Sequence, residues 1–139
     1  MGTSAFSWLH RHTLVPELMS DLFNWMNKSR NTIHPLILAS VFHYEFVFIH
    51  PFSDGNGRMA RAMAHSLFSQ NGSLIFEYIP IESQIEKFQT EYYDAIAQCH
   101  RAGSSTGFIE FMLSQIDKIL DDIPAQINEE NHLLSDYVQ

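Results

Sequence analysis

Cysteine, long apolar runs and positive charge are all scarce in this sequence. Cys99 is the single cysteine among 139 residues, which excludes an internal disulfide and fits a reducing compartment, so we expect a cytoplasmic protein. No apolar run approaches the roughly 20 residues of a membrane-spanning helix, and no secretory signal pattern stands at the N-terminus, so no membrane partner is expected. Lys and Arg number 8 against 16 Asp and Glu, which gives a net charge of −8 and disfavours direct binding to nucleic acid.

What the sequence does contain is apolar periodicity of the helical kind. Leu14, Leu18 and Leu22 recur at helical spacing, and we expect their side chains to pack in the core. Residues 35–49 are apolar nearly all round, which predicts a buried central helix in which His43 is a core histidine rather than a ligand. The fold class is therefore all-α, a single compact bundle of about six helices, with a short extended segment allowed near residues 74–81. The expected helices cover residues 14–26, 35–49, 59–69, 84–100 and 107–120.

Capping residues suggest where several of these helices begin and end. Thr32 or His34 is expected to cap the central helix, with Pro35 in its first turn. Ser83 and Glu86 form a capping-box pattern that predicts the start of the helix over residues 84–100, and Gly103 is expected to close it. Thr106 is expected to cap the last core helix and Pro124 to end it. The domain assignment is an N-terminal remnant at 1–13, a core at 14–122 and an acidic tail at 123–139, either helical or disordered.

One stretch gathers polar, charged and glycine residues between the central helix and the next. Pro51 disfavours a helical conformation at the preceding residue and so marks the end of the central helix. A glycine-rich turn that opens a helix presents free N–H groups at the positive end of the helix dipole, which is a site for phosphate. The stretch reads His50-Pro51-Phe52-Ser53-Asp54-Gly55-Asn56-Gly57-Arg58-Met59-Ala60-Arg61.

The position of the two arginines strengthens the phosphate interpretation. Arg58 and Arg61 stand in the first turns of the following helix, where a cation opposes the helix dipole at a cost of roughly 0.3–1 kcal/mol each. Two cations on one face near a helix N-terminus are locally unfavourable, and locally unfavourable residues tend to mark functional sites. A bound polyanion would remove the conflict.

Three other interpretations explain the stretch less completely. The letters from Gly55 to Ala60 fit the dinucleotide pattern G-x-G-x-x-A with Glu77 further on, but that pattern needs strands on both sides, which the chain lacks. A calcium loop starting at Asp54 fails, because its fifth position is Arg58 and its twelfth is His65. A plain Asp-Gly turn explains the glycines and neither arginine.

The stretch resembles the signature of the Fic family, H-P-F-x-[D/E]-G-N-G-R-x-x-R, at every specified position, and the resemblance extends over roughly residues 14–119. It implies the all-α Fic fold and a protein adenylyltransferase, which uses ATP with Mg²⁺ to transfer AMP onto a hydroxyl of a target protein. It also implies that Tyr92 or Tyr93 helps to form the adenine and ribose pocket, with His100 at the position of a family asparagine.

The residue types suggest a role for each position of the motif. Imidazole titrates near neutral pH, so His50 is the expected general base. Asp54 is a hard oxygen ligand suited to Mg²⁺, and Phe52 is expected to anchor the loop in the core. The expected nucleotide- and phosphate-binding residues are Ser53, Gly55, Asn56, Gly57, Arg58, Arg61, Tyr92, Tyr93 and His100, with the two arginines on the β- and γ-phosphates.

The resemblance also sets expectations for partners. It implies a target protein that offers a Ser, Thr or Tyr hydroxyl, and an inhibitory segment or antitoxin outside this chain, and it leaves homodimer formation open. Glu130 stands in a degenerate match to the family's inhibitory motif. No convincing counterpart of the family's target-binding β-hairpin is found in residues 1–13, and similar segments occur in longer bacterial proteins. The alternatives are a nucleotide-binding module without catalysis, or AMP removal, phosphocholine transfer or phosphoryl transfer on the same site.

Overall fold

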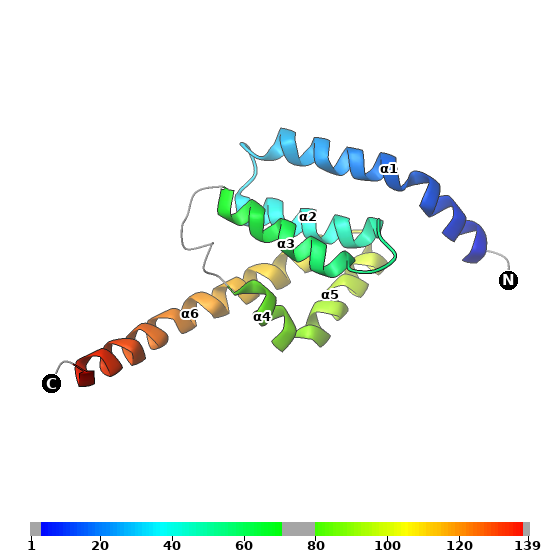
Figure 1. The fold of residues 1–139 in the computed structure, drawn as a ribbon. Helices are drawn as coiled ribbons and strands as arrows, with labels where there is room; N and C mark the ends of the chain where they lie inside the picture. Colours follow the sequence, from blue (N-terminus) through cyan, green and yellow to red (C-terminus); the bar gives the residue numbers. More distant parts are fainter. Residues whose placement is uncertain (1–3, 71–79, 138–139) are drawn as a thin grey trace.

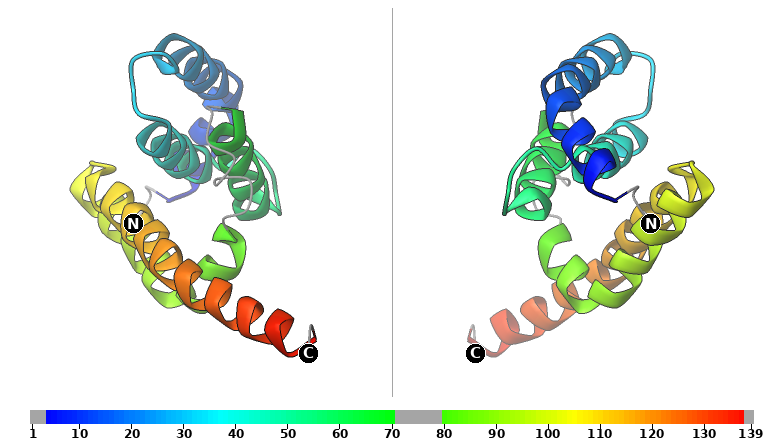
Figure 2. Two further views of the ribbon diagram at one scale, coloured as in Figure 1. Left: turned by 90° about the vertical axis from the view of Figure 1, so that its left-hand side faces the viewer. Right: turned by 90° about the vertical axis from the view of Figure 1, so that its right-hand side faces the viewer.

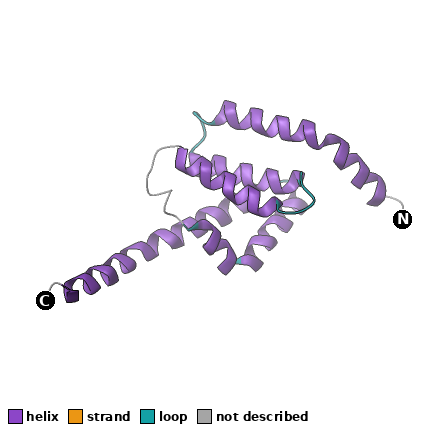
Figure 3. Cartoon of the chain, viewed as in Figure 1, coloured by secondary structure: helices purple, strands orange, loops and turns teal. Residues whose placement is uncertain are grey.

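The computed structural model describes residues 4–70 and 80–137, with side chains described for residues 14–67 and 80–123. These residues are helical apart from short connections, and no strand occurs in the described ranges (Figure 1, Figure 3), which confirms the all-α prediction. None of the described helices is long and apolar enough to cross a membrane. The helices are α1 Ser4–Ser29, α2 Pro35–Ile49, α3 Asn56–Gln70, α4 Ile81–Lys87, α5 Gln89–Ala102 and α6 Thr106–Tyr137.

The α2 helix lies at the centre of the fold, as its apolar sequence predicts. It contacts α1, α3 and α6, and Figure 2 shows it between α1 on one side and the α5–α6 pair on the other. Leu38, Ala39 and Phe42 are each 0% exposed. A helix that is apolar on all faces is stable in water only when neighbours cover it on all faces, which is the position that α2 occupies.

The two ends of α2 follow from local chemistry. His34 caps the start, because its Nδ1 accepts a hydrogen bond from the Leu36 N–H at 3.2 Å, and Pro35 follows in the first turn. At the other end His50 adopts a left-handed conformation with φ 56 and ψ 60, and its N–H donates to the Phe46 carbonyl at 3.0 Å. The site loop therefore starts directly from the central helix.

The first helix is longer than predicted and is less buried at its start. It begins at Ser4 rather than at residue 14, and Leu22 is buried, but Leu14 and Leu18 are 39% and 38% exposed. The prediction that Leu14 and Leu18 pack in the core is therefore wrong. Figure 1 shows that α1 continues beyond the end of its neighbour α2. Leu18 lines an open cavity of about 350 Å³ with Phe48 and Ile49 of α2, so packing between the two helices leaves its side chain partly accessible.

The helix predicted over residues 84–100 is divided into α4 and α5 at Phe88. Pro80 occupies the N-cap of α4 without a side-chain hydrogen bond, and Ser83 lies inside the helix, so the capping-box prediction is wrong. Ile81 is 2% exposed, and burying it starts the helix earlier than the capping pattern suggests. Gly103 ends α5 in a left-handed conformation, as predicted. The expected extended segment falls mostly at residues 74–79, outside the described residues.

The last helix runs through the proline that was expected to end it. It begins at Thr106, and the Ser105 carbonyl accepts from the Phe108 and Ile109 N–H groups, so the cap lies at Ser105, one residue before the predicted cap Thr106. The helix continues past Pro124 to Tyr137, so the tail takes the helical alternative. A proline inside a helix costs one hydrogen bond and about 3 kcal/mol, and it does not prevent the helix from continuing. Phe108, Met112 and Ile116 anchor the first half in the core, whereas the C-terminal half extends away from the other helices (Figure 1).

Candidate active site

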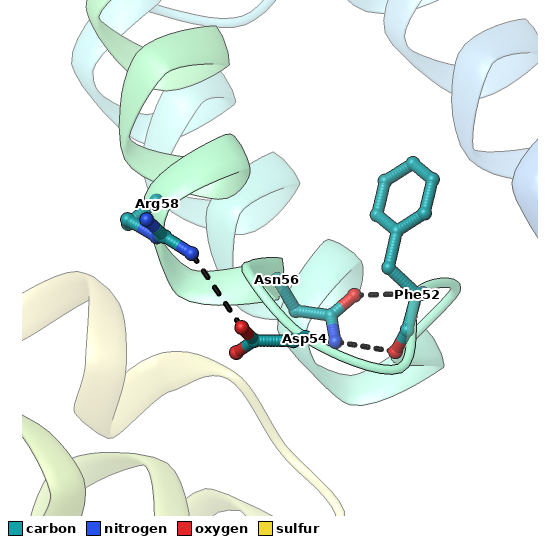
Figure 4. Close-up of polar contacts among 4 residues, drawn as sticks. All are labelled: Phe52, Asp54, Asn56 and Arg58. Carbon is teal, nitrogen blue, oxygen red and sulfur yellow. Dashed lines mark hydrogen bonds and ion pairs between the residues drawn. The ribbon is translucent and has the colours of Figure 1, made fainter.

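The loop between α2 and α3 is closed by one amide side chain. Asn56 is 5% exposed. Its Nδ2 donates to the Phe52 carbonyl at 2.7 Å, and its Oδ1 accepts from the Phe52 N–H at 2.9 Å (Figure 4). This pair of bonds imitates backbone pairing across the loop and fixes its shape. The Asn56 side chain therefore has a structural role that the sequence did not suggest, and its backbone N–H remains as the group to offer a ligand.

Phe52 was expected to anchor this loop from within the core, and that expectation is wrong. Its side chain is 50% exposed, and its ring centre lies 6.3 Å from that of Phe46 at the edge of the core. The loop is instead held through the Phe52 backbone by Asn56. Half of the ring is left at the surface, beside the polar part of the loop.

The start of α3 presents the backbone groups that the phosphate interpretation requires. The first helical hydrogen bond runs from the Met59 N–H to the Gly55 carbonyl at 3.0 Å. The N–H groups of Asn56, Gly57 and Arg58 therefore precede the first N–H that donates within the helix, that of Met59, and point out of its positive end. Gly55 has φ +80, a left-handed conformation that strongly favours glycine.

The outer part of the loop is fully open to solvent. Arg58 Nη2 lies 3.6 Å from Asp54 Oδ2, with the two side chains 76% and 92% exposed (Figure 4). His50 and Ser53 are exposed as well. Phe52, Asp54, Gly55, Arg58, Met59 and Ala62 line an open depression of about 460 Å³.

Arg61 is half-buried and packs against the glycine that precedes it by one helical turn. A Cβ on Gly57 would lie 3.2 Å from Arg61 Nη1, so the missing side chain makes room for the guanidinium. The charge of Arg61 lies close enough to Tyr92 of α5 to act on the pKa of the Tyr92 hydroxyl. Gly55 makes room for Arg58 in the same way, with a Cβ-to-Nη2 distance of 3.5 Å. Each motif glycine thus accommodates one motif arginine.

Behind Arg61 lies a buried pair that joins α2 to α5. His43 Nε2 and Tyr92 Oη are 2.7 Å apart, and the residues are 0% and 2% exposed. Burial, and secondarily the charge of Arg61, lowers the pKa of His43 to about 3, so the imidazole is neutral. Burial raises the pKa of Tyr92 to about 12, with the Arg61 charge opposing the shift. His43 is a core histidine, as predicted.

The two tyrosines and His100 are placed differently from one another. Tyr93 is 57% exposed and Tyr92 is 2% exposed. Of these two tyrosines, Tyr93 is therefore the one whose side chain is accessible to a ligand. His100 is exposed, and its Nδ1 lies 2.7 Å from the Ile96 carbonyl. His100 lines a second cavity of about 180 Å³ with Tyr44, Glu45 and Phe48, whose lining shares no residue with the depression at Asp54. Nucleotide contacts by these residues stay predictions.

Asp54 fits Mg²⁺ only as a ligand shared with phosphate. No cluster of three or more His, Cys, Asp or Glu that could hold a metal occurs in the described part of the chain. Mg²⁺ usually binds one or two carboxylates together with substrate phosphates, so a single exposed carboxylate beside the α3 N-terminus suits it. Glu130, the candidate inhibitory carboxylate, falls outside the residues whose side chains are described.

Comparisons with known proteins agree on one family. A model of the Fic/DOC family matches residues 3–68. Protein adenylyltransferase Fic of Drosophila grimshawi is 33% identical over 79% of this chain, and that of Culex quinquefasciatus is 34% identical over 75%. The chain spans only 23% and 20% of those two proteins. A Fic family protein from Desulfovibrio desulfuricans G20 has a similar structure, with a TM-score of 0.75 and 37% identity over 83% of this chain and 35% of its own.

Proposed function

Because the chain belongs to the Fic/DOC family, we propose that it is a protein adenylyltransferase that moves AMP from ATP to a hydroxyl of a target protein. One observation supports this most. The exposed His50 lies at the start of the loop between α2 and α3, and the N-terminus of α3 with its two arginines lies at the other end of that loop, whose shape is fixed by Asn56. An anion site next to a free imidazole suits the transfer of a phosphorus-centred group.

In the proposed reaction the target hydroxyl attacks the α-phosphorus of ATP. His50 takes the hydroxyl proton, a new P–O bond forms to the target, and the bond to pyrophosphate breaks. Phosphoryl-type transfers need little covalent help, so positioning and charge stabilisation provide most of the acceleration. Arg58, Arg61 and the N–H groups at the start of α3 would bind the phosphates.

His50 has a backbone conformation that supports a functional role. A left-handed conformation at a residue other than glycine costs about 1–2 kcal/mol, and His50 adopts it with φ 56. Such strain persists where the surrounding structure imposes it, often at active sites. Here it turns the chain sharply out of α2 and places the imidazole at the surface, where a target hydroxyl could reach it.

Asp54 would hold Mg²⁺ together with oxygens of the nucleotide phosphates. When bound, the ion would neutralise phosphate charge. The ion pair with Arg58 is exposed and therefore weak, so it leaves the carboxylate free to exchange partners.

The test is incubation with Mg²⁺ and ATP labelled at either the α- or the γ-phosphate, in the presence of cell lysate. Transfer of AMP places the α-label and no γ-label on protein, whereas phosphoryl transfer does the reverse. His50→Ala is the matched control. Protein labelling from γ-labelled ATP alone would reject adenylylation in favour of a kinase-like reaction, and equal α-labelling by His50→Ala would reject the assignment of the base.

A second candidate is a nucleotide-binding module that transfers nothing. The observation in its favour is that residues 4–13 are helical in α1, so they do not form the β-hairpin that the Fic resemblance associates with target binding. Binding of ATP without labelling of any protein, the wild-type chain included, would favour this candidate over the transferase.

A further inference from the structure

The central helix also lines a cavity that the proposed function does not use. This cavity has a volume of about 350 Å³ and lies between α1 and α2, which pack side by side (Figure 1). Its lining shares no residue with the depression at Asp54. Sites for small molecules have volumes of about 300–1,000 Å³. The cavity is therefore large enough for a small ligand.

The walls of the cavity are apolar and come from one face of each helix. They are formed by Leu18, Leu22 and Trp25 of α1 and by Val41, Phe48 and Ile49 of α2. Within each helix these residues follow the i, i+4, i+7 and i+8 spacing of a single face. Leu18 and Phe48 are each 38% exposed, so a ligand in the cavity would remove apolar surface from water.

Each of the two apolar faces is interrupted by one carboxylate that also lines the cavity. Asp21 lies one helical turn from Leu18 and Trp25 on α1, and Glu45 lies one turn after Val41 on α2. Apolar residues are expected at such positions, because the two faces pack against each other. No ion pair to either carboxylate occurs among the described side chains. Charges placed against the packing pattern tend to mark functional positions.

Glu45 is better placed than Asp21 to attract a cation. Glu45 is half-buried, whereas Asp21 is exposed. Burial raises the pKa of Glu45, and the charge of His100 on α5 opposes that rise. A carboxylate that has lost part of its water gains more from an opposite charge than an exposed one, because water screens the exposed charge. Trp25 and Phe48 add aromatic rings, whose faces also attract cations.

We propose that the cavity between α1 and α2 binds a small amphipathic cation, an ammonium group attached to an apolar body. The body packs against the leucines of α1 and against Phe48, and the ammonium pairs with Glu45. Charge complementarity argues against two other occupants. A neutral apolar ligand would desolvate Glu45 without giving it a partner. A second copy of the chain would bring a net charge of −8 toward the two carboxylates.

Three probes that share one skeleton and differ in charge test the inference: phenylpropylammonium, phenylpropanol and phenylpropionate. Each is titrated into the full chain and followed by amide and methyl NMR signals. The ammonium should bind with a Kd of about 1 mM, as expected for a ligand of this size, and should shift signals of the lining residues. The alcohol and the carboxylate should bind several-fold more weakly. An alcohol that binds as tightly as the ammonium would overturn the inference.

Glu45→Gln separates pairing with this carboxylate from general attraction to an acidic protein. It should raise the Kd of the ammonium roughly three- to tenfold, through loss of a charge-assisted contact, and leave that of the alcohol unchanged. Glu110→Gln is the matched control, because it removes the same charge from an exposed position on α6 outside the cavity. It should alter neither Kd. Equal weakening by the two variants would overturn the inference.

Val41→Phe tests the location of the site, because the larger side chain should fill the cavity and abolish binding of the ammonium. Thermal unfolding checks that each variant folds, and the comparison of the three probes on the wild-type chain needs no variant. Wild-type protein whose lining residues show no shift with any probe would overturn the inference. A dimer in sedimentation velocity would then assign this face to a second copy of the chain.

Discussion

Two groups of residues, each with one histidine and one motif arginine, have opposite surroundings in this protein. His50, Asp54 and Arg58, the outer group, are exposed and belong to the loop and the first turn of α3. His43, Tyr92 and Arg61, the inner group, are buried or half-buried and come from α2, α5 and α3. The difference indicates a division of labour: the outer group is free to meet substrate and metal, whereas the one arginine of the inner group, proposed to bind phosphate, is confined by the fold.

The largest expected effect is on the outer group's base. His50→Ala should lower the rate of AMP transfer by about 10²–10⁴-fold, because that is the typical contribution of a general base. ATP affinity should change little, since His50 lies in the loop before the N–H groups that are proposed to bind phosphate. Transfer is measured with α-labelled ATP and affinity by calorimetry. A His50→Ala protein that modifies itself or a target at the wild-type rate would show that this histidine is structural.

Acid should destabilise the fold through the inner histidine. The unfolded chain takes up a proton at His43 near its ordinary pKa of 6.5, whereas the folded protein does so only at about 3. Lowering the pH from 6.5 toward 3 therefore favours the unfolded state, by up to about 1.4 kcal/mol per pH unit from this residue. His43→Leu should reduce the pH dependence of the urea midpoint in this range. Identical pH dependence in the two proteins would contradict the buried, neutral state of His43.

The two glycines offer a sharper contrast between the groups. Gly57→Ala should weaken ATP binding roughly threefold to tenfold, because its Cβ would crowd Arg61 Nη1 at 3.2 Å. Its stability should hold or rise, since alanine is favoured over glycine within a helix by about 0.8–1 kcal/mol. Gly55→Ala should instead cost about 1–2 kcal/mol of stability, because φ is +80 there. Calorimetry and urea unfolding measure the two quantities, and parallel changes in both variants would refute the contrast.

The smallest effect on stability is expected at Asp54. Its ion pair with Arg58 is exposed on both sides, and such pairs contribute about 0–1 kcal/mol. Asp54→Asn should therefore leave the urea midpoint nearly unchanged while weakening the dependence of ATP binding on Mg²⁺. Titrations of ATP with and without Mg²⁺ test this, and an undiminished Mg²⁺ dependence in Asp54→Asn would remove Asp54 as the metal ligand.

The sequence predicted the outer group more completely than the inner one. The spacing of glycines and arginines is local, and so is the proline that ends α2, so the loop and its anion site could be inferred from neighbouring residues alone. The bond between His43 and Tyr92 joins positions 49 residues apart. Helical periodicity marks both residues as core, but it contains no information on which buried polar groups meet.

Three further features of the structure could not be inferred from the sequence. The Asn56 side chain closes the loop on the Phe52 backbone, which leaves its backbone N–H as the group to offer a ligand. The capping box at Ser83 was a sound local pattern, and burial of Ile81 against the other helices overrode it. Leu14 and Leu18 follow the helical stripe of α1, yet both side chains stay exposed, and Leu18 lines an open cavity between α1 and α2.

The most direct test of the account is ATP titration into Arg58→Ala, Arg61→Ala and the double variant, each with Mg²⁺. Both arginines are assigned to phosphate, so each single variant should bind ATP more weakly than wild type. The loss should be larger for Arg61→Ala, because Arg61 is half-buried and packs against Gly57, so its side chain loses less entropy on binding. Equal affinity in the double variant and the wild type would contradict the phosphate site itself, and a larger loss for Arg58→Ala would contradict the division between the outer and inner groups.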